Sequence, residues 1–361
     1  MDGDGGGPGS VAASRGDGRR LPRLRLAHLP TPLVSPRRLA QAMGIDLWVK
    51  RDDATAGAET GNKVRKLEYL LGDAQARGAD TIVTCGGIQS NHARATALCA
   101  AALGMRAVLF LRTLDLQGQE QLDHAERDAT RIALEGNVLL DRMVSAEIRL
   151  ISPAEYRERN ALMQEHARGL AASGARPYLV PEGGSNGLGS LGYVDAMGEV
   201  RRQLDLGLAG GKPFDVVVHA CGSGGTAAGV VLGAGRYEVA AEVRAMAVCD
   251  DAPTFERVIE RIIGEAVDLD PRLRGAAARL VVDDAAKGPA YAVSTVPQRR
   301  RMVEATRLSG LVFDPVYTGK ALAGLWDLVD SGALRGERVL FIHTGGLPGL
   351  LAQGATFGDS L

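Results

Sequence analysis

Lysine is scarce in this chain, and two lysines lie together beside an apolar segment. Of the 42 lysine and arginine residues among 361, only six are lysine. Lys63 and Lys66 fall in AETGNKVRKLEYLL (58–71), which is predicted to be a loop that leads into an amphipathic helix. Arginine neither loses its proton in a protein nor forms a Schiff base, whereas lysine can do both. Lys63, at the junction of loop and helix, is therefore the candidate reactive amine; the alternative is an ordinary solvated lysine.

A glycine-rich turn could bind an anion. The segment VVVHACGSGGTAAGVVLGAG (216–235) predicts a strand, a turn over residues 222–226, and a helix. Backbone N–H groups at such a helix start attract negative charge, and the helix dipole adds to the attraction. No Lys-Ser/Thr follows, so the turn is not a Walker A loop, and it departs from the dinucleotide fingerprint. A phosphate monoester fits it better than a pyrophosphate; the alternative is a tight turn that simply needs glycine.

A second polar turn, CGGIQSNHARA (85–95), joins a predicted strand to a predicted helix. Ser90 or Asn91 as the helix N-cap is a sufficient structural explanation. The same donors could instead hold a substrate carboxylate. A reactive lysine combined with a phosphate site suggests pyridoxal phosphate, because the aldehyde of this cofactor needs a primary amine.

Six segments, in this order, resemble the signature blocks of the D-cysteine desulfhydrase and 1-aminocyclopropane-1-carboxylate deaminase family. This family consists of pyridoxal-phosphate enzymes of the tryptophan-synthase-β fold, fold type II. The resemblance runs from about residue 25 to 353 and implies a small amino-acid substrate and a homodimer. The segments are GNKVRKLEYL, GGIQSNHARATA, EGGSNGLGSLGY, CGSGGTAAG, DPVYTGKALAGL and FIHTGGLPGL.

The resemblance also implies roles for individual residues. Lys63 would form the Schiff base, and Asn91 would hydrogen-bond the phenolic oxygen of the cofactor and meet the substrate. Ser90, with Gln89 near it, would meet the substrate carboxylate or help to move a proton. Tyr317 would lie near the cofactor ring and the substrate. Further cofactor contacts would come from the backbone of Gly222, Ser223, Gly224, Gly225 and Thr226, from Lys66, and, by a looser match in GPAYAVS, from Tyr291.

Two threonines distinguish the reactions of the family. Deaminases that open the cyclopropane ring have glutamate after the tyrosine of the VY block and read H-L-G-G in the last block; this chain has Thr318 and Thr344. A threonine hydroxyl would leave the pyridine nitrogen largely neutral, which β-elimination tolerates because the leaving thiolate takes the electron pair. The resemblance therefore implies conversion of D-cysteine, or a close β-substituted D-amino acid, to pyruvate, ammonia and hydrogen sulfide. The alternatives are a 1-aminocyclopropane-1-carboxylate deaminase, an L-cysteate sulfo-lyase, and a non-catalytic binder with the same fold.

The elements that must position these residues alternate between strand-like and helix-like patterns. Such alternation, with short apolar strands, predicts α/β architecture with mostly parallel sheets, in which ligands bind beyond the carboxyl ends of the strands. We expect two open three-layer αβα domains: a large cofactor-binding domain (25–63 and 175–361) and a smaller inserted domain (64–174), after a disordered tail (1–24). Residues 265–297 have no clear pattern. Strands are predicted at 45–50, 80–85, 106–111, 147–151, 177–180, 214–220, 242–249 and 338–344. Helices are predicted at 63–78, 91–104 and about 125–144, and after the strand at 147–151 to about 173.

Charge and composition exclude several classes of partner. The net charge is −1 and aromatic residues make up 4%, so nucleic acid and anionic membranes are not expected as partners. No apolar run is long enough to span a bilayer. The four cysteines are widely spaced without a C-x-x-C pair, which predicts buried thiols in a reducing cytoplasm and no zinc site. After the first predicted strand, Arg51-Asp52-Asp53 predicts an internal ion pair that braces the active-site loop.

Overall fold

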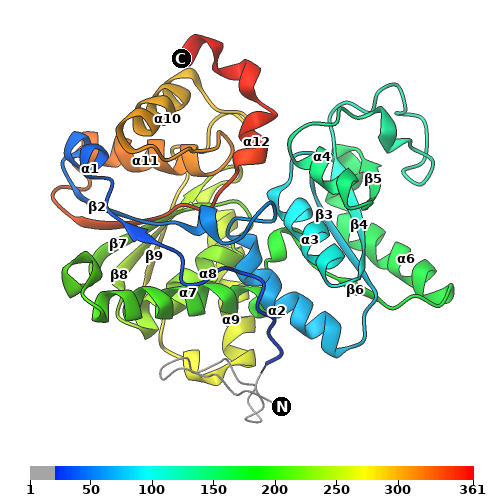
Figure 1. Cartoon of the computed structure of the whole chain (residues 1–361), viewed down its shortest axis with the longest axis horizontal. Helices are drawn as coiled ribbons and strands as arrows, with labels where there is room; N and C mark the ends of the chain where they lie inside the picture. The colour runs from blue at the N-terminus through cyan, green and yellow to red at the C-terminus, as the bar shows by residue number, and fades with distance from the viewer. Residues whose placement is uncertain (1–20) are drawn as a thin grey trace.

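Two sheets, one large and one small, organise the chain. The computed structural model describes residues 21–361 (Figure 1). The strands are β1 (Leu33–Val34), β2 (Asp46–Lys50), β3 (Thr81–Gly87), β4 (Arg106–Arg112), β5 (Glu147–Ile151), β6 (Pro177–Leu179), β7 (Phe214–Cys221), β8 (Ala240–Ala247), β9 (Arg279–Asp283) and β10 (Arg338–Ile342). The large sheet has the order β1-β2-β10-β7-β8-β9 and the small sheet the order β5-β4-β3-β6. Only the pairing of β1 with β2 is antiparallel among these strands, which confirms the expected mostly parallel architecture.

Helices cover both faces of each sheet. They are α1 (Arg37–Met43), α2 (Lys63–Ala76), α3 (Asn91–Ala102), α4 (Gly136–Met143), α5 (Pro153–Arg157), α6 (Arg159–Ala172), α7 (Gly187–Asp205), α8 (Gly225–Arg236), α9 (Ala252–Leu269), α10 (Val296–Ser309), α11 (Thr318–Asp330) and α12 (Leu347–Leu351). Successive strand residues point to opposite faces of a sheet. In the large sheet Val218 therefore packs against α1, α10 and α11, whereas Val217 packs against α7 and α8. In the small sheet Leu109 packs against α2 and α3, and Phe110 against α5 and α6. Both units are three-layer αβα sandwiches, as predicted.

All eight predicted strands are present, but three expectations about the chain's organisation differ from the structure. Strand β6 pairs with β3, so the small sheet extends beyond the predicted boundary at residue 174. Of the predicted tail, residues 1–20 lie outside the described part of the chain, whereas Leu21 is buried and Arg23 pairs with Glu68. No element was predicted for region 265–297, which contains β9 at the edge of the large sheet.

The third difference is the long helix predicted around 125–144, which is wrong. Residues 129–131 form one 3₁₀ turn and only α4 is helical after it. The carboxylates of Asp123 and Asp128 each accept a hydrogen bond from the backbone N–H two residues later. Such local bonds favour turns over continuous helix. The segment that follows β4 is therefore a long irregular excursion before α4.

A buried ion network fixes the chain around the start of α2. The predicted ion pair after β2 is present, with Arg51 and Asp53 2.7 Å apart. The neighbouring Asp52 is fully buried and pairs with Arg65 at 2.8 Å, one turn into the helix that begins at Lys63. Lys50 and Glu199 complete the network at 2.5 Å. Because the ions are bonded to one another across β2, α2 and α7, the position of Lys63 is fixed from three elements.

Candidate active site

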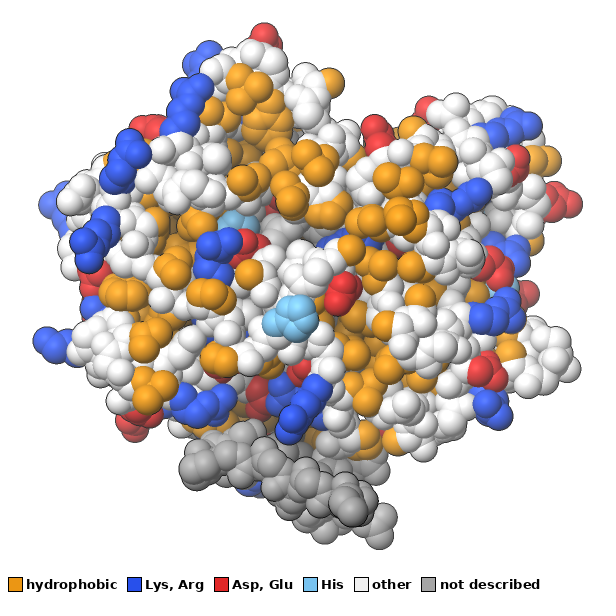
Figure 2. Space-filling view, viewed as in Figure 1, with side chains coloured by type: hydrophobic (Ala, Val, Ile, Leu, Met, Phe, Trp, Pro, Cys, Tyr) orange, Lys and Arg blue, Asp and Glu red, His pale blue; other side chains and the backbone are white. Residues whose placement is uncertain are grey.

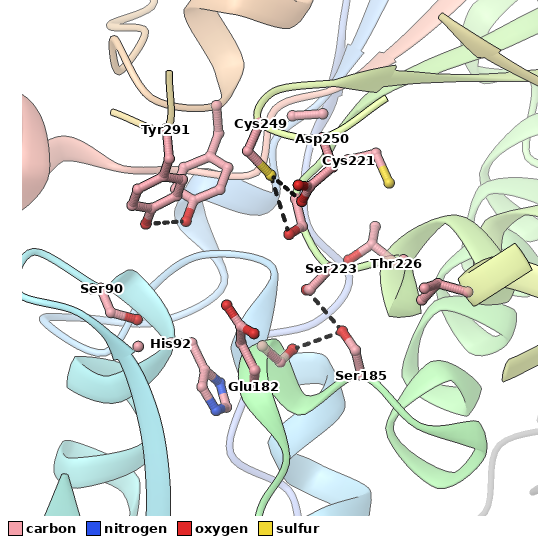
Figure 3. A pocket seen from close by; sticks show the side chains of 18 of the residues that line it. Ser90, His92, Glu182, Ser185, Cys221, Ser223, Thr226, Cys249, Asp250 and Tyr291 are labelled. Carbon is pink, nitrogen blue, oxygen red and sulfur yellow. Dashed lines mark hydrogen bonds between the residues drawn. The ribbon is translucent and has the colours of Figure 1, made fainter. Parts of the chain in front are cut away.

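A cavity of about 720 Å³ lies between the two sheets and contains most of the predicted site (Figure 3). It opens at the carboxyl ends of β3, β4 and β7, where ligands of parallel sheets bind. The predicted residues that line the cavity are Lys63, Ser90, Asn91, Gly222, Ser223, Gly224, Thr226, Tyr291, Tyr317 and Thr344.

Among the helices of residues 21–361, none has the length and apolar character needed to cross a membrane.

Lys63 is the first residue of α2, and its amine faces the cavity. Its Nζ donates to Asn62 Oδ1 at 3.2 Å and lies 6.0 Å from the centroid of the Tyr317 ring. Burial lowers the pKa of this amine to about 8, although the carboxylates of Asp314 and Glu182 oppose the shift. A substantial fraction of Lys63 is therefore neutral near physiological pH, as nucleophilic and proton-transfer roles require.

The turn between β7 and α8 requires glycine. Gly224 has φ +81°, and a Cβ there would lie 2.9 Å from Val258. A Cβ on Gly222 would lie 2.9 Å from the ring of Tyr317. Hydroxyl groups surround the turn, since Ser223 Oγ lies 2.8 Å from Ser185 Oγ and Thr226 Oγ1 accepts from Asn62 Nδ2 at 3.1 Å. The turn thus brings a helix N-terminus and three hydroxyls to one end of the cavity, a donor set suited to phosphate.

Two of the residues predicted to bind the phosphate lie just outside the cavity. Lys66 Nζ donates to Gly183 O at 3.1 Å and to Ser185 Oγ at 3.3 Å, so its amine supports the loop behind the turn. The N–H of Gly225 donates to the same Ser185 Oγ at 3.2 Å. Both groups reach the anion site through Ser185, a residue that the sequence interpretation did not single out.

Two tyrosines form one wall of the cavity. Tyr291 and Tyr317 hydroxyls lie 2.7 Å apart, and their rings are edge-on at 72°. Burial raises the pKa of Tyr291 to about 12 and that of Tyr317 well above its usual value. Both hydroxyls are therefore neutral at physiological pH and can donate hydrogen bonds. The loose match that suggested Tyr291 does place it beside Tyr317.

The start of α3 forms the opposite wall. Ser90 is its N-cap, and Ser90 Oγ accepts from the N–H of Ala93 at 3.2 Å. Asn91 Oδ1 accepts from Asn137 Nδ2 at 3.2 Å, so its side-chain orientation is set by α4. Gln89 points away from the cavity: its Nε2 donates to Glu135 O, and its Oε1 accepts from the N–H of Asn137 at 2.8 Å. The amide of Gln89 is bonded to the segment that leads into α4, and its contact with substrate stays a prediction.

The two diagnostic threonines differ in position. Thr344 follows β10 and lines the cavity. Thr318 does not line it, because its hydroxyl is fully buried, donating to Asp314 Oδ1 at 2.7 Å and accepting from the N–H of Asp314 at 2.9 Å. Thr318 therefore fixes the start of α11 through Asp314, and its contact with the cofactor stays a prediction.

Comparison with known proteins decides the family. The sequence profile described as "Pyridoxal-phosphate dependent enzyme" matches residues 24–345. The chain belongs to this family of enzymes. It is 41% identical over 330 residues, 90% of this chain and 78% of the relative, to the Arabidopsis thaliana "Bifunctional D-cysteine desulfhydrase/1-aminocyclopropane-1-carboxylate deaminase, mitochondrial". A crystal structure of an "ACC deaminase homologue" matches 94% of this chain and 97% of its own with a TM-score of 0.81 and 35% identity. Threonine deaminase isoform 2 from Solanum lycopersicum, 16% identical with a TM-score of 0.60 over 89% of this chain and 80% of its own, shares the fold alone.

The family's cofactor is pyridoxal phosphate, and the residues present fit it. The glycine turn leaves room that a Cβ on Gly222 or Gly183 would fill, since these Cβ atoms would lie 2.9 Å from Tyr317 and 2.2 Å from Ser223 Oγ. Ser185, Ser223 and Thr226 supply hydroxyl donors for a phosphate, and Lys63 supplies a primary amine on the same cavity. The residues of the turn would hold the phosphate and Lys63 would hold the aldehyde.

Proposed function

We propose that the protein catalyses β-elimination from D-cysteine, or a close β-substituted D-amino acid, to give pyruvate, ammonia and hydrogen sulfide. The observation that carries this proposal is the pair Thr318 and Thr344, where the ring-opening branch has glutamate and leucine. Thr344 lines the cavity, and so does Tyr317, the residue before Thr318. A threonine in place of that glutamate supplies no carboxylate at this position to keep the pyridine nitrogen protonated. Elimination of a good leaving group tolerates this weaker electron withdrawal, whereas opening a cyclopropane ring does not.

The residues around the cavity can perform the steps of such an elimination. When bound, pyridoxal phosphate withdraws electrons from the bond to the α-proton. Lys63 Nζ, with its pKa lowered to about 8, can accept that proton. The N-terminus of α3, with Ser90 as its cap, can orient the substrate carboxylate. The paired hydroxyls of Tyr291 and Tyr317 can donate a hydrogen bond to the departing sulfur.

A panel of substrates tests the proposal. Purified holoenzyme is incubated with D-cysteine, L-cysteine, L-cysteate and 1-aminocyclopropane-1-carboxylate, and sulfide, sulfite, pyruvate and 2-oxobutyrate are measured. We expect sulfide and pyruvate from D-cysteine, and their loss in Lys63→Ala. Lys212→Ala, which changes an exposed lysine after α7, is the matched control and is expected to keep full activity.

Deamination of 1-aminocyclopropane-1-carboxylate is the second candidate function. It is favoured by the names of the Arabidopsis relative, which is called bifunctional, and of the matched crystal structure. Formation of 2-oxobutyrate without sulfide would establish it and overturn the first. Sulfite from L-cysteate would instead indicate a sulfo-lyase.

Assembly and location also remain proposals: we propose a cytoplasmic homodimer. All four cysteines are free thiols, which suits a reducing compartment. Figure 2 shows hydrophobic side chains gathered on both sides of the notch between the two lobes, over α12 and α4. Leu347 and Leu351 on α12, and Leu139 and Met143 on α4, are exposed there, which supports coverage by a second copy. Sedimentation equilibrium that gives a monomer at micromolar concentration would contradict the dimer.

A further inference from the structure

Arg112 occupies a position in the cavity that the elimination steps above do not use. It is the last residue of β4 and pairs with Gly87 at the end of β3. It lines the same cavity as Ser90 and Tyr291. Both strands end at the edge where substrates bind in parallel sheets. Arg112 points to the same face of the small sheet as Phe110, the face covered by α5, where its guanidinium lies over the ring of Tyr156.

Two tyrosine rings fix the guanidinium. Its carbon lies 4.9 Å from the centroid of Tyr156 and 5.1 Å from that of Tyr291. Each ring is itself fixed by its hydroxyl, since Tyr156 donates to Glu182 at 2.6 Å and Tyr291 bonds to Tyr317. Stacking between aromatic faces holds a planar guanidinium in place while its N–H groups at the edge stay free to bind.

The charge of Arg112 has no partner among the described residues. Three arginines line the cavity, and two of them are paired: Arg159 with Glu182 at 2.9 Å, and Arg261 with Glu265. Within residues 21–361, the guanidinium of Arg112 makes neither an ion pair nor a hydrogen bond to protein. A fixed, uncompensated arginine at a substrate cavity is the arrangement that recognises an anionic group of the ligand.

We propose that Arg112 forms a subsite for an anionic sulfur group on the β-carbon of the amino-acid substrate. The α-carboxylate would bind at the N-terminus of α3, and the β-substituent would extend to Arg112. In elimination from cysteine the α-proton moves to Lys63 Nζ, the Cβ–S bond breaks, and its electron pair leaves with sulfur as hydrosulfide, whose charge Arg112 stabilises. A sulfonate substituent would be bound as an anion before it leaves as sulfite. This inference rests on the proposed function, and it disfavours the cyclopropane amino acid, which has no second anionic group.

Binding of a matched pair of amino acids tests the subsite without turnover. Aspartate and asparagine have the same shape, but only aspartate has an anionic β-substituent, and neither has a good leaving group. Titration calorimetry of the holoenzyme is carried out with both enantiomers of each amino acid. We expect aspartate to bind about tenfold or more tightly than asparagine, because charge-assisted hydrogen bonds to a guanidinium contribute a free energy of that size. Arg112→Gln is expected to abolish this preference and to leave the affinity for asparagine nearly unchanged.

Two further variants make the outcome decisive. Arg261→Gln also removes a cation from the cavity lining, but one paired with Glu265, and is expected to keep the preference. Arg112→Lys keeps the positive charge but loses the planar group that stacks between the tyrosines. It is expected to keep part of the preference for aspartate. Equal affinity of wild type for aspartate and asparagine would overturn the proposal. So would an equal loss for both ligands in Arg112→Gln, because Arg112 would then bind the shared α-carboxylate. Absence of sulfide release with the aspartate preference intact would contradict the proposed reaction alone.

Discussion

Replacing Glu199 with glutamine is expected to destabilise the fold strongly, because it unbalances the ion network under α2. Glu199 Oε1 accepts from Lys50 Nζ at 2.5 Å, from the N–H of Thr31 at 2.9 Å and from Arg65 at 3.0 Å. With Asp52, the network has two buried cations and two buried anions. The Glu199→Gln variant would leave one buried positive charge uncompensated and place an amide NH₂ or a weaker acceptor against Lys50.

The expected size follows from the burial of these charges. Removing one partner of a buried ion pair costs about 3–5 kcal/mol of unfolding free energy. Asp205→Asn is the matched control, because Asp205 pairs with Arg201 on the exposed face of α7 and such pairs contribute at most about 1 kcal/mol. Burial opposes ionisation of Glu199, but the charges of Arg65 and Lys50 lower its pKa overall. Its stabilisation is therefore present at neutral pH and is lost as the pH falls through the lowered pKa of the folded state.

Urea unfolding of the holoenzyme, followed by circular dichroism, measures both variants. We expect a large drop in the unfolding midpoint for Glu199→Gln and almost none for Asp205→Asn. Activity is also expected to fall, because Arg65 lies two residues after Lys63 and fixes that turn of α2. Equal midpoints for the two variants would refute the view that this network holds α2 in place.

Three further predictions concern the cavity. The pKa of Lys63 is lowered to about 8, so its neutral fraction should fall about tenfold per pH unit below that value; uptake of pyridoxal phosphate by the apoprotein should slow in step, and a rate that does not vary with pH would contradict this. Lys320→Met should speed amide hydrogen exchange at 287–291, because Lys320 Nζ donates to the carbonyls of Lys287 and Ala290 at 2.6 and 2.9 Å; unchanged exchange would show that the loop bearing Tyr291 does not depend on this amine. Gly222→Ala should weaken cofactor binding, since its Cβ would lie 2.9 Å from Tyr317, whereas Gly264→Ala on α9, where nothing lies within 4 Å, should not; equal cofactor affinities of these two variants would count against the proposed phosphate turn.

Local signals explain why much of the fold and part of the site were predictable. The eight strands were visible as short apolar runs, because both faces of a parallel sheet are buried. Ser90 was recognisable as an N-cap from its place before an apolar helix, and the glycine turn from its composition alone. In each case the neighbours in sequence determine the conformation.

Side-chain orientation was less predictable, because it depends on partners distant in sequence. Gln89 is turned away by Asn137, and Asn91 is oriented by the same residue of α4. Thr318 is held by Asp314, whose carboxylate caps the start of α11. Arg112 could have been found by inspecting the residue that follows each predicted strand, here the one predicted at 106–111, because parallel sheets bind ligands at that edge.

The scarcity of lysine has a broader explanation than reactivity. Lys50, Lys66 and Lys320 are all buried, and each donates to carbonyl, hydroxyl or carboxylate oxygens that surround a compact ammonium group. The planar guanidinium of arginine would not fit such a compact cage. Scarcity therefore indicated amines in special surroundings, and only their position on the cavity separates Lys63 from the others.

The most direct test of the account is the site of cofactor attachment. Holoenzyme is treated with borohydride, digested, and analysed by mass spectrometry. We predict a stable pyridoxyl adduct on the peptide that contains Lys63, and no adduct in Lys63→Ala. An adduct on Lys66, on another lysine, or on none would contradict the central claim that Lys63 is the amine that binds the cofactor.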